Sequence, residues 1–146
     1  MYGYHGRFLE VDLSAGTTEE IPLSEETLEK YVGGATLAAA LVYERVTNEL
    51  DPLSPENPLV FSTGPFTGSS VPMVSRYAAC GISPLTGFWG EATSGGRFPV
   101  RLKGAGFDGL IVTGRAEKPV YLHLETGKAE IRDASQLWGK DSYETQ

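Results

Sequence analysis

The sequence predicts an α+β domain that is rich in β structure and contains only a few short helices. Two similar segments, 11–21 and 122–131, each show a strand pattern, a glycine-containing turn and a return through acidic residues to Ile, which is typical of β-hairpins. Helical periodicity is confined to short stretches. The 146 residues are about one domain in length, so we expect a single domain over 1–146 with an internally duplicated hairpin substructure, although similar hairpins also arise independently.

The first predicted elements are a hairpin and two short helices. Alternation over 8–13 (FLEVDL) and the Ser-Ala-Gly turn that follows it predict the first hairpin. Ser24 precedes two glutamates, which is typical of a helix N-cap, and the paired glycines at 33–34 end this helix. From Ala35, an apolar stripe predicts a second helix, which the proline-rich segment 51–58 ends.

The rest of the chain alternates predicted strands with glycine-rich loops. The predicted elements are strands at 59–63, 76–82 and 109–114, a short helix at 99–103 and a hairpin at 119–133. The segment 87–96 (GFWGEATSGG) is predicted to be irregular or weakly extended. Asp141 or Ser142 is then typical of a helix N-cap without the body of a helix, so we expect the sequence to be the front part of a longer chain.

Composition excludes several classes of function. A net charge of −7 repels polyanions and argues against a nucleic-acid partner. The sequence has no run near the roughly 18 apolar residues of a membrane span and no secretory signal, so we expect no membrane partner and a cytoplasmic location. Cys80 is the single cysteine, so this chain alone cannot build a disulfide or a complete iron–sulfur cluster. Its apolar strand context predicts that Cys80 is buried.

Three loops of small residues are predicted to surround one cation, Arg76: 62–70 (STGPFTGSS), 82–87 (ISPLTG) and 92–96 (ATSGG). Glycines let backbone amides approach a ligand, hydroxyls donate to phosphate oxygens and an arginine adds a bidentate clamp, so the set suits a phosphorylated cofactor. The alternative is that these loops only turn corners in a β-rich fold. The GxGxxG match at 104–109 precedes a strand instead of opening a helix, so it does not predict a dinucleotide site.

No catalytic residue is predicted, because the sequence contains neither a GxSxG nor an HExxH motif. Glu91 and Asp108 are the acids nearest the glycines, and Glu91 is expected to face water. Phe88 and Trp89 could cover a planar ligand, but packing in the core is favoured for both.

Over 1–146 the sequence closely resembles the N-terminal part of the tungsten-containing aldehyde:ferredoxin oxidoreductases. The motifs LSPEN, TGPFTG, SPLTG and AGFDGLIVTG, in this order, carry the resemblance. It implies an internally duplicated, β-rich N-terminal domain on which a tungsten bis-molybdopterin cofactor rests. It also implies that a magnesium ion links the phosphates of the two pterins, and that a 4Fe-4S cluster takes its cysteine ligands from outside this chain.

The resemblance also implies site residues. Arg76 matches an arginine that contacts the pterin cofactor. The family's NSGG loop is matched by Thr93, Ser94, Gly95 and Gly96. Thr93 replaces the asparagine, whose backbone carbonyl approaches the magnesium ion in the family, so we expect Thr93 to be the metal contact. The chain also lacks the arginine that commonly follows the paired glycines, where Ala35 and Thr36 stand instead.

The resemblance implies that the full-length protein oxidises an aldehyde to a carboxylic acid with ferredoxin as electron acceptor. The fragment alone is expected to be inactive, and a homodimer is compatible with the family. Two alternatives stay open at this point. One is a stand-alone, non-catalytic module that binds a pterin or a phosphate, and the other is a related tungsten enzyme that reduces an acyl or aromatic thioester.

Overall fold

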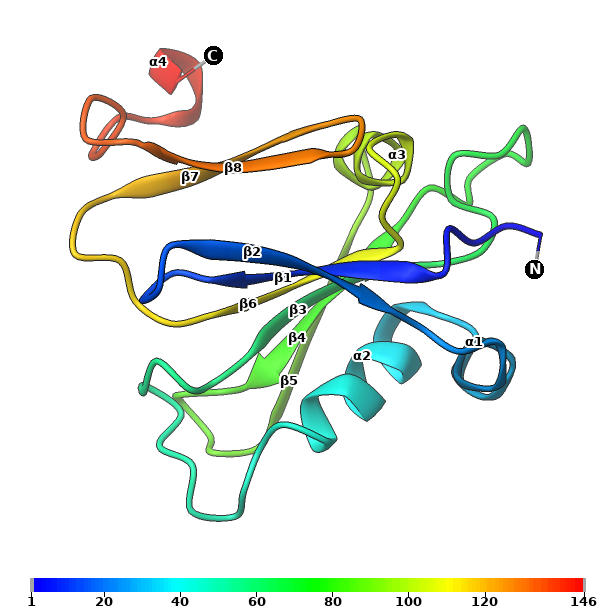
Figure 1. Ribbon diagram of the computed structural model, residues 1–146, viewed down its shortest axis with the longest axis horizontal. Helices are drawn as coiled ribbons and strands as arrows, with labels where there is room; N and C mark the ends of the chain where they lie inside the picture. Colours follow the sequence, from blue (N-terminus) through cyan, green and yellow to red (C-terminus); the bar gives the residue numbers. More distant parts are fainter. Residues whose placement is uncertain (1, 146) are drawn as a thin grey trace.

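The structure, a computed structural model, describes residues 2–145. These residues form two β-sheets and four short helices (Figure 1). The strands are β1 (Arg7–Asp12), β2 (Thr17–Pro22), β3 (Leu59–Thr63), β4 (Tyr77–Ile82), β5 (Trp89–Ser94), β6 (Gly109–Thr113), β7 (Val120–Glu125) and β8 (Lys128–Asp133). The helices are α1 (Glu25–Tyr31), α2 (Gly34–Tyr43), α3 (Phe98–Gly104) and α4 (Ser142–Thr145).

The first sheet has six strands in the order β2-β1-β6-β3-β4-β5, and the second holds only β7 and β8. In the first sheet β1 and β6 are parallel, and the other neighbouring strands are antiparallel. The predicted β-rich α+β class is therefore confirmed. Both self-similar segments form hairpins, but β1–β2 belongs to the large sheet whereas β7–β8 stands apart as a sheet of its own (Figure 1).

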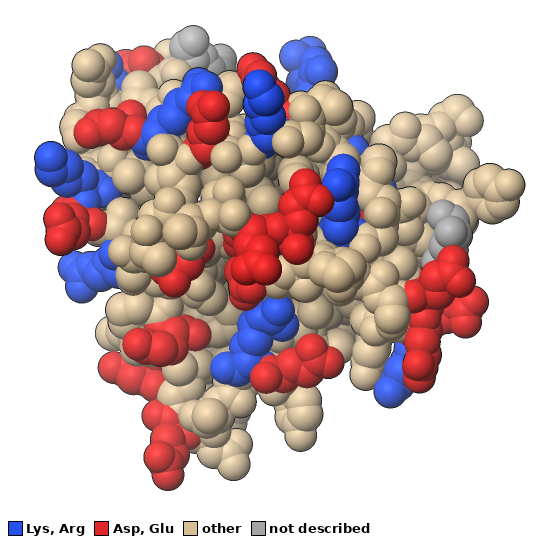
Figure 2. All heavy atoms as spheres, in the orientation of Figure 1, with Lys and Arg blue, Asp and Glu red and all other residues tan. Residues whose placement is uncertain are grey.

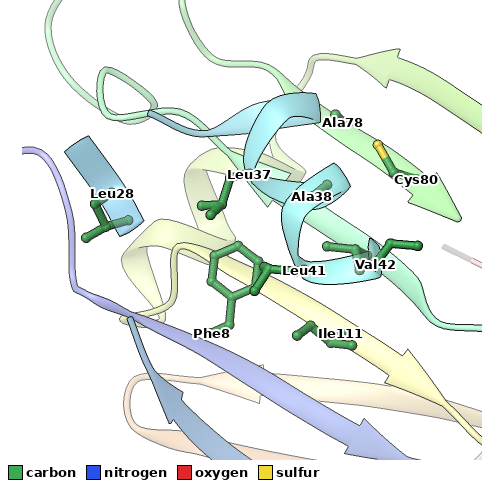
Figure 3. Packing of buried hydrophobic residues seen from close by; sticks show 10 residues of the cluster. Phe8, Leu28, Leu37, Ala38, Leu41, Val42, Ala78, Cys80 and Ile111 are labelled. Atoms are coloured by element: carbon green, nitrogen blue, oxygen red, sulfur yellow. The ribbon is translucent and has the colours of Figure 1, made fainter. Parts of the chain in front are cut away.

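Each face of the six-stranded sheet carries its own core, because successive side chains of a strand point to opposite faces. Helices α1 and α2 cover one face, where Phe8 and Ile111 pack with Leu41 of α2 (Figure 3). Helix α3 and the β7–β8 hairpin cover the other face, where Leu9 packs with Leu102 of α3. The sheet is thus the middle layer of the domain.

The predicted helix caps are confirmed. The Ser24 hydroxyl accepts a hydrogen bond from the Thr27 amide at 3.0 Å and caps α1. At the other end of the chain, the Asp141 carboxylate accepts from the amides of Tyr143 and Glu144 and caps α4. Helix α2 ends at Tyr43, before the proline-rich segment 51–58 that was predicted to end it.

The prediction for 87–96 was wrong, because residues 89–94 form a regular edge strand. β5 pairs with β4 from Ile82↔Trp89 to Tyr77↔Ser94. Glycine and alanine have low strand propensity, but propensity depends strongly on context, and six consecutive pairs with β4 outweigh it. Gly95, Gly96 and Arg97 form the loop between β5 and α3.

The prediction that Phe88 and Trp89, at the turn of the β4–β5 hairpin, pack in the core was also wrong. Phe88 and Trp89 do not pack in the core, since 76% and 39% of their surfaces are exposed. They lie at the turn between β4 and the edge strand β5, and the Trp89 indole donates a hydrogen bond to the Glu91 carboxylate at 3.4 Å. Cys80 is buried, as predicted. Burial, with a smaller contribution from the carboxylate of Glu91, raises the pKa of the Cys80 thiol to about 11. The thiol is therefore not a nucleophile at neutral pH.

The surface carries scattered charges of both signs. On the face seen in Figure 2, lysines and arginines are interspersed with aspartates and glutamates and form no continuous basic area. Of the helices in the described part of the chain, none combines the length and the apolar character that crossing a bilayer requires.

Candidate cofactor site

One end of the six-stranded sheet gathers the predicted site residues. β3 ends at Thr63, which pairs with Tyr77 at the start of β4, and Tyr77 pairs with Ser94 at the end of β5. The antiparallel order therefore brings the loop after β3, Arg76 and the Gly95–Gly96 loop to the same end, which we call the site end. The loop 82–87 joins β4 to β5 at the opposite end, so the prediction that three loops surround Arg76 was wrong for this one.

A pocket of about 250 Å³ opens at the site end. Arg76 and Thr93 both line it, although they are 17 residues apart, which unites the predicted arginine and the start of the predicted loop. The other lining residues are Val32, Gly33, Gly34, Ala35, Gly64, Pro65, Val74, Tyr77 and Ala78. Ser94, Gly95 and Gly96 do not line this pocket, but Gly95 lies against Ser75, the residue before Arg76.

One wall of the pocket, residues 32–35 of the α1–α2 connection, was not predicted from the sequence to belong to the site. The paired glycines were interpreted only as the end of a helix, and their contact with the β3 loop cannot be inferred from their spacing. A Cβ atom on Gly33 would lie 2.6 Å from the carbonyl oxygen of Thr63, so only glycine allows this close approach. The approach places the start of α2 beside Gly64 in the pocket.

Val32 holds this connection in a strained turn. Its φ of 61° and ψ of −57° define the rarer form of γ-turn, and the Gly33 amide donates the corresponding hydrogen bond to the Tyr31 carbonyl at 2.7 Å. For a β-branched residue such a conformation costs about 1–3 kcal/mol. The Tyr4 hydroxyl donates to the Val32 carbonyl at 2.7 Å. Burial, with a smaller contribution from the Asp108 carboxylate, raises the pKa of Tyr4, so this hydroxyl stays a donor.

The site end offers hydrogen-bond donors that no acceptor in residues 2–145 uses. The exposed Arg76 guanidinium forms no hydrogen bond or ion pair with any residue in 2–145. Within the same range the amides of Gly95 and Gly96 have no acceptor, and no side chain caps the N-terminus of α2. Guanidinium groups, free backbone amides and helix N-termini all favour anions, and phosphate in particular.

The donor set fits a phosphorylated ligand better than a metal ion held by side chains. Within the described residues, no three His, Cys, Asp or Glu side chains lie close enough together to hold a metal. A cation at the site end would therefore depend on backbone carbonyls and on oxygens of the ligand, which are the donors that Mg²⁺ accepts together with water. The geometry is thus compatible with a magnesium ion that a phosphorylated cofactor brings.

Comparison with known proteins gives a consistent family. The sequence matches the family described as aldehyde ferredoxin oxidoreductase, N-terminal domain, over residues 8–146. It is 47% identical over 146 residues to the tungsten-containing aldehyde ferredoxin oxidoreductase of Pyrococcus furiosus, a match that covers 100% of this chain and 24% of that protein. The WOR-like subunit of the aliphatic sulfonate oxidoreductase of the same organism is 37% identical over 148 residues, with 99% of this chain and 23% of that protein covered.

A solved structure has the same fold. The active site complex BamBC of benzoyl coenzyme A reductase, in complex with 1,5 dienoyl-CoA, superposes with a TM-score of 0.95 at 38% sequence identity. The match covers 99% of this chain and 22% of that one. The chain thus spans about a quarter of the length of the relatives it matches.

Proposed function

The chain belongs to the aldehyde ferredoxin oxidoreductase family as an N-terminal domain, and from this membership we propose that its site end holds the phosphates of a tungsten bis-molybdopterin cofactor. The observation that carries the proposal is the pocket that Arg76 and Thr93 share beside the uncapped start of α2. Residues 1–146 would then act as one cofactor-binding domain of a longer oxidoreductase. The family's tungsten-containing members support tungsten as the metal.

Each site residue has a role that its chemistry allows. The Arg76 guanidinium would offset the charge of a pterin phosphate through charge-assisted hydrogen bonds. The free amides of Gly95 and Gly96 would donate to phosphate oxygens, next to the last β5 residue, Ser94. The backbone carbonyl of Thr93 would be one ligand of a magnesium ion bound together with the cofactor.

When bound, the tungsten centre supplies the two-electron chemistry by which an aldehyde becomes a carboxylic acid, with ferredoxin as the acceptor of the electrons. The residues of this chain would bind and orient the cofactor, and we assign none of them as a catalytic acid or base. A 4Fe-4S cluster would take its cysteine ligands from elsewhere, because this chain has a single cysteine, the buried Cys80. A cytoplasmic location and a homodimer stay predictions.

A second candidate is the reduction of an aromatic thioester by a related tungsten enzyme. The fold shared with the BamBC complex of benzoyl coenzyme A reductase favours it, and the residues of the site end suit both reactions because they would hold only the cofactor. Assays of the full-length protein with an aldehyde and with benzoyl coenzyme A separate the two. A protein that purifies with bound pterin or phosphate but without tungsten, and that is inactive in both assays, would instead support the stand-alone, non-catalytic binding module.

The proposal is tested by Arg76→Ala in the full-length protein that carries this domain. A lost charge-assisted hydrogen bond weakens binding by about 1.5–3 kcal/mol, so we expect about tenfold or greater loss of cofactor affinity, with no change in the unfolding temperature of the cofactor-free protein. The pterin and tungsten contents of the purified protein measure this loss. Arg115→Ala is the matched control, because Arg115 is an exposed arginine that follows β6 at the opposite end of the sheet. Equal cofactor contents in both variants would contradict the proposal.

A further inference from the structure

The site end also holds a buried polar network. Among residues 2–145, five polar or charged side chains are buried, and all five lie at this end of the sheet: Ser62, Thr63, Thr67, Lys103 and Asp108. Burying polar and charged groups is unfavourable unless they are fully hydrogen-bonded, and apolar residues of similar volume often stabilise a core as well or better. The network therefore calls for a role besides stability.

Asp108 is the centre of this network. Its carboxylate accepts hydrogen bonds from the ammonium of Lys103 at 2.6 Å and from the amides of His5 and Gly6 at 2.9 and 2.7 Å. The Lys103 ammonium also donates to the carbonyl of Gly3 at 2.6 Å. Only 8% of the Lys103 side chain and 2% of the Asp108 side chain are exposed. The ion pair thus ties α3 and the N-terminal segment to the start of β6.

From Asp108 the hydrogen bonds continue to the residue proposed to bind phosphate. The Asp108 carbonyl accepts from the hydroxyl of Thr63 at 2.7 Å and from its amide at 3.0 Å. In the next turn of chain, the Gly64 amide donates to the Thr67 hydroxyl at 3.3 Å. The same hydroxyl donates to the carbonyl of Arg76 at 3.2 Å. In the described chain, this is the hydrogen bond that joins loop 64–69 to Arg76.

We infer that Thr67 is a positioning residue: its hydroxyl fixes the backbone of Arg76, and through it the guanidinium, against the network centred on Asp108. The inference rests on the proposed function, because it assigns to Thr67 an effect on cofactor retention that passes through Arg76. The Arg76 side chain has no partner of its own in residues 2–145, so its direction depends on how its backbone is held. Thr67 suits this task because it is 95% buried and makes both of its hydrogen bonds to the two loops that line the pocket.

The test compares Thr67→Val, which keeps the shape but removes the hydroxyl, with Thr67→Ser, which keeps the hydroxyl, in the full-length protein. The rate at which pterin is released during incubation is measured, together with the unfolding temperature. We expect Thr67→Val to release pterin roughly 2- to 12-fold faster, the range for one net hydrogen bond, and Thr67→Ser to behave like the unsubstituted protein. Thr67→Ala serves the same purpose if Thr67→Val does not fold.

The decisive measurement repeats Thr67→Val in the Arg76→Ala background. If Thr67 acts through Arg76, the second substitution adds no further increase in the release rate. An equal increase in both backgrounds would show a general structural role and overturn the inference, as would an unchanged rate in Thr67→Val alone. Arg76→Ala by itself distinguishes a failure of the proposed function from a failure of the inference about Thr67. If Arg76→Ala leaves pterin retention unchanged, the proposed function is wrong. If Arg76→Ala reduces pterin retention but Thr67→Val does not, only the positioning role of Thr67 is wrong.

Discussion

The two ends of the six-stranded sheet are built from similar residue types but held in different ways. At the site end, loops rich in glycine and hydroxyl residues are held by a polar network that contains the buried Lys103–Asp108 ion pair. At the opposite end, the side-chain amide of Asn57 joins segment 52–57 to the end of β4. Its nitrogen donates to the backbone carbonyls of Pro52 and Ile82, both at 2.8 Å, and its oxygen accepts from the backbone amide of Ile82. Beyond it, Leu85 and Phe88 are exposed to solvent.

This difference shows that composition does not decide which glycine-rich loop forms a site. Both ends have such loops, and both were predicted to contribute. The two ends differ in whether the loops pack against a buried ion pair and whether donors such as the Arg76 guanidinium have a partner within residues 2–145. Removing one member of the buried polar network is therefore expected to lower the free energy of unfolding more than removing a solvent-exposed hydrogen bond at the opposite end.

The largest effect is expected for Asp108→Ala. It leaves the Lys103 ammonium buried without its counter-ion, which costs about 3–5 kcal/mol of unfolding free energy. The matched control at the opposite end is Asp12→Ala, since the Asp12 carboxylate also accepts from two backbone amides but is solvated, and its loss is expected to cost about 1 kcal/mol. Urea unfolding measures both. Similar losses at the two positions would remove the contrast between the ends.

A smaller effect is expected for Asn57→Ala, which removes the three hydrogen bonds that hold the opposite end. Because this region is only partly buried, water replaces some of them, and we expect a loss of about 2 kcal/mol, below that of Asp108→Ala. Asn48→Ala, at an exposed asparagine with no side-chain hydrogen bond in 2–145, is the control and should change stability by less than about 0.5 kcal/mol. A loss for Asn57→Ala as large as for Asp108→Ala would mean that both ends are held equally.

The smallest effect, and one of opposite sign, is expected for Val32→Gly. Glycine adopts a positive φ without steric cost, so relief of the γ-turn strain should outweigh the entropy that glycine adds to the unfolded chain. We expect the unfolding free energy to rise by about 1 kcal/mol. Glu29→Gly, inside α1, should lower it by about 0.5–1 kcal/mol. If both substitutions destabilise alike in thermal unfolding, Val32 is not strained.

Local elements were predictable because their signals are local. Ser24 and Asp141 cap helices through hydrogen bonds to amides two or three residues away, and both hairpins are closed by adjacent strands. The edge strand β5 was not predictable from its own residues, because a strand so poor in apolar side chains forms only through its pairing with β4.

The site was predictable only in part, for a physical reason. Resemblance pointed to Arg76 and Thr93, and the structure brings them to one pocket. The paired glycines of the pocket wall and the hydroxyl of Thr67 carry no signal in the sequence, because their partners are set by sheet topology. Asp108 lies 45 residues from Thr63 in the chain, and no periodicity links two such positions.

The strand order has a consequence for how the domain is made. β6, the last strand of the large sheet to be synthesised, lies at its centre, parallel to β1 and antiparallel to β3. A nascent chain that ends before residue 109 therefore holds two separate sheet fragments, β1–β2 and β3–β4–β5, with no strand pair between them. The open edges of β1 and β3 then stay available to other chains until β6 leaves the ribosome, and the Asp108 carboxylate arrives with it to lock the site end.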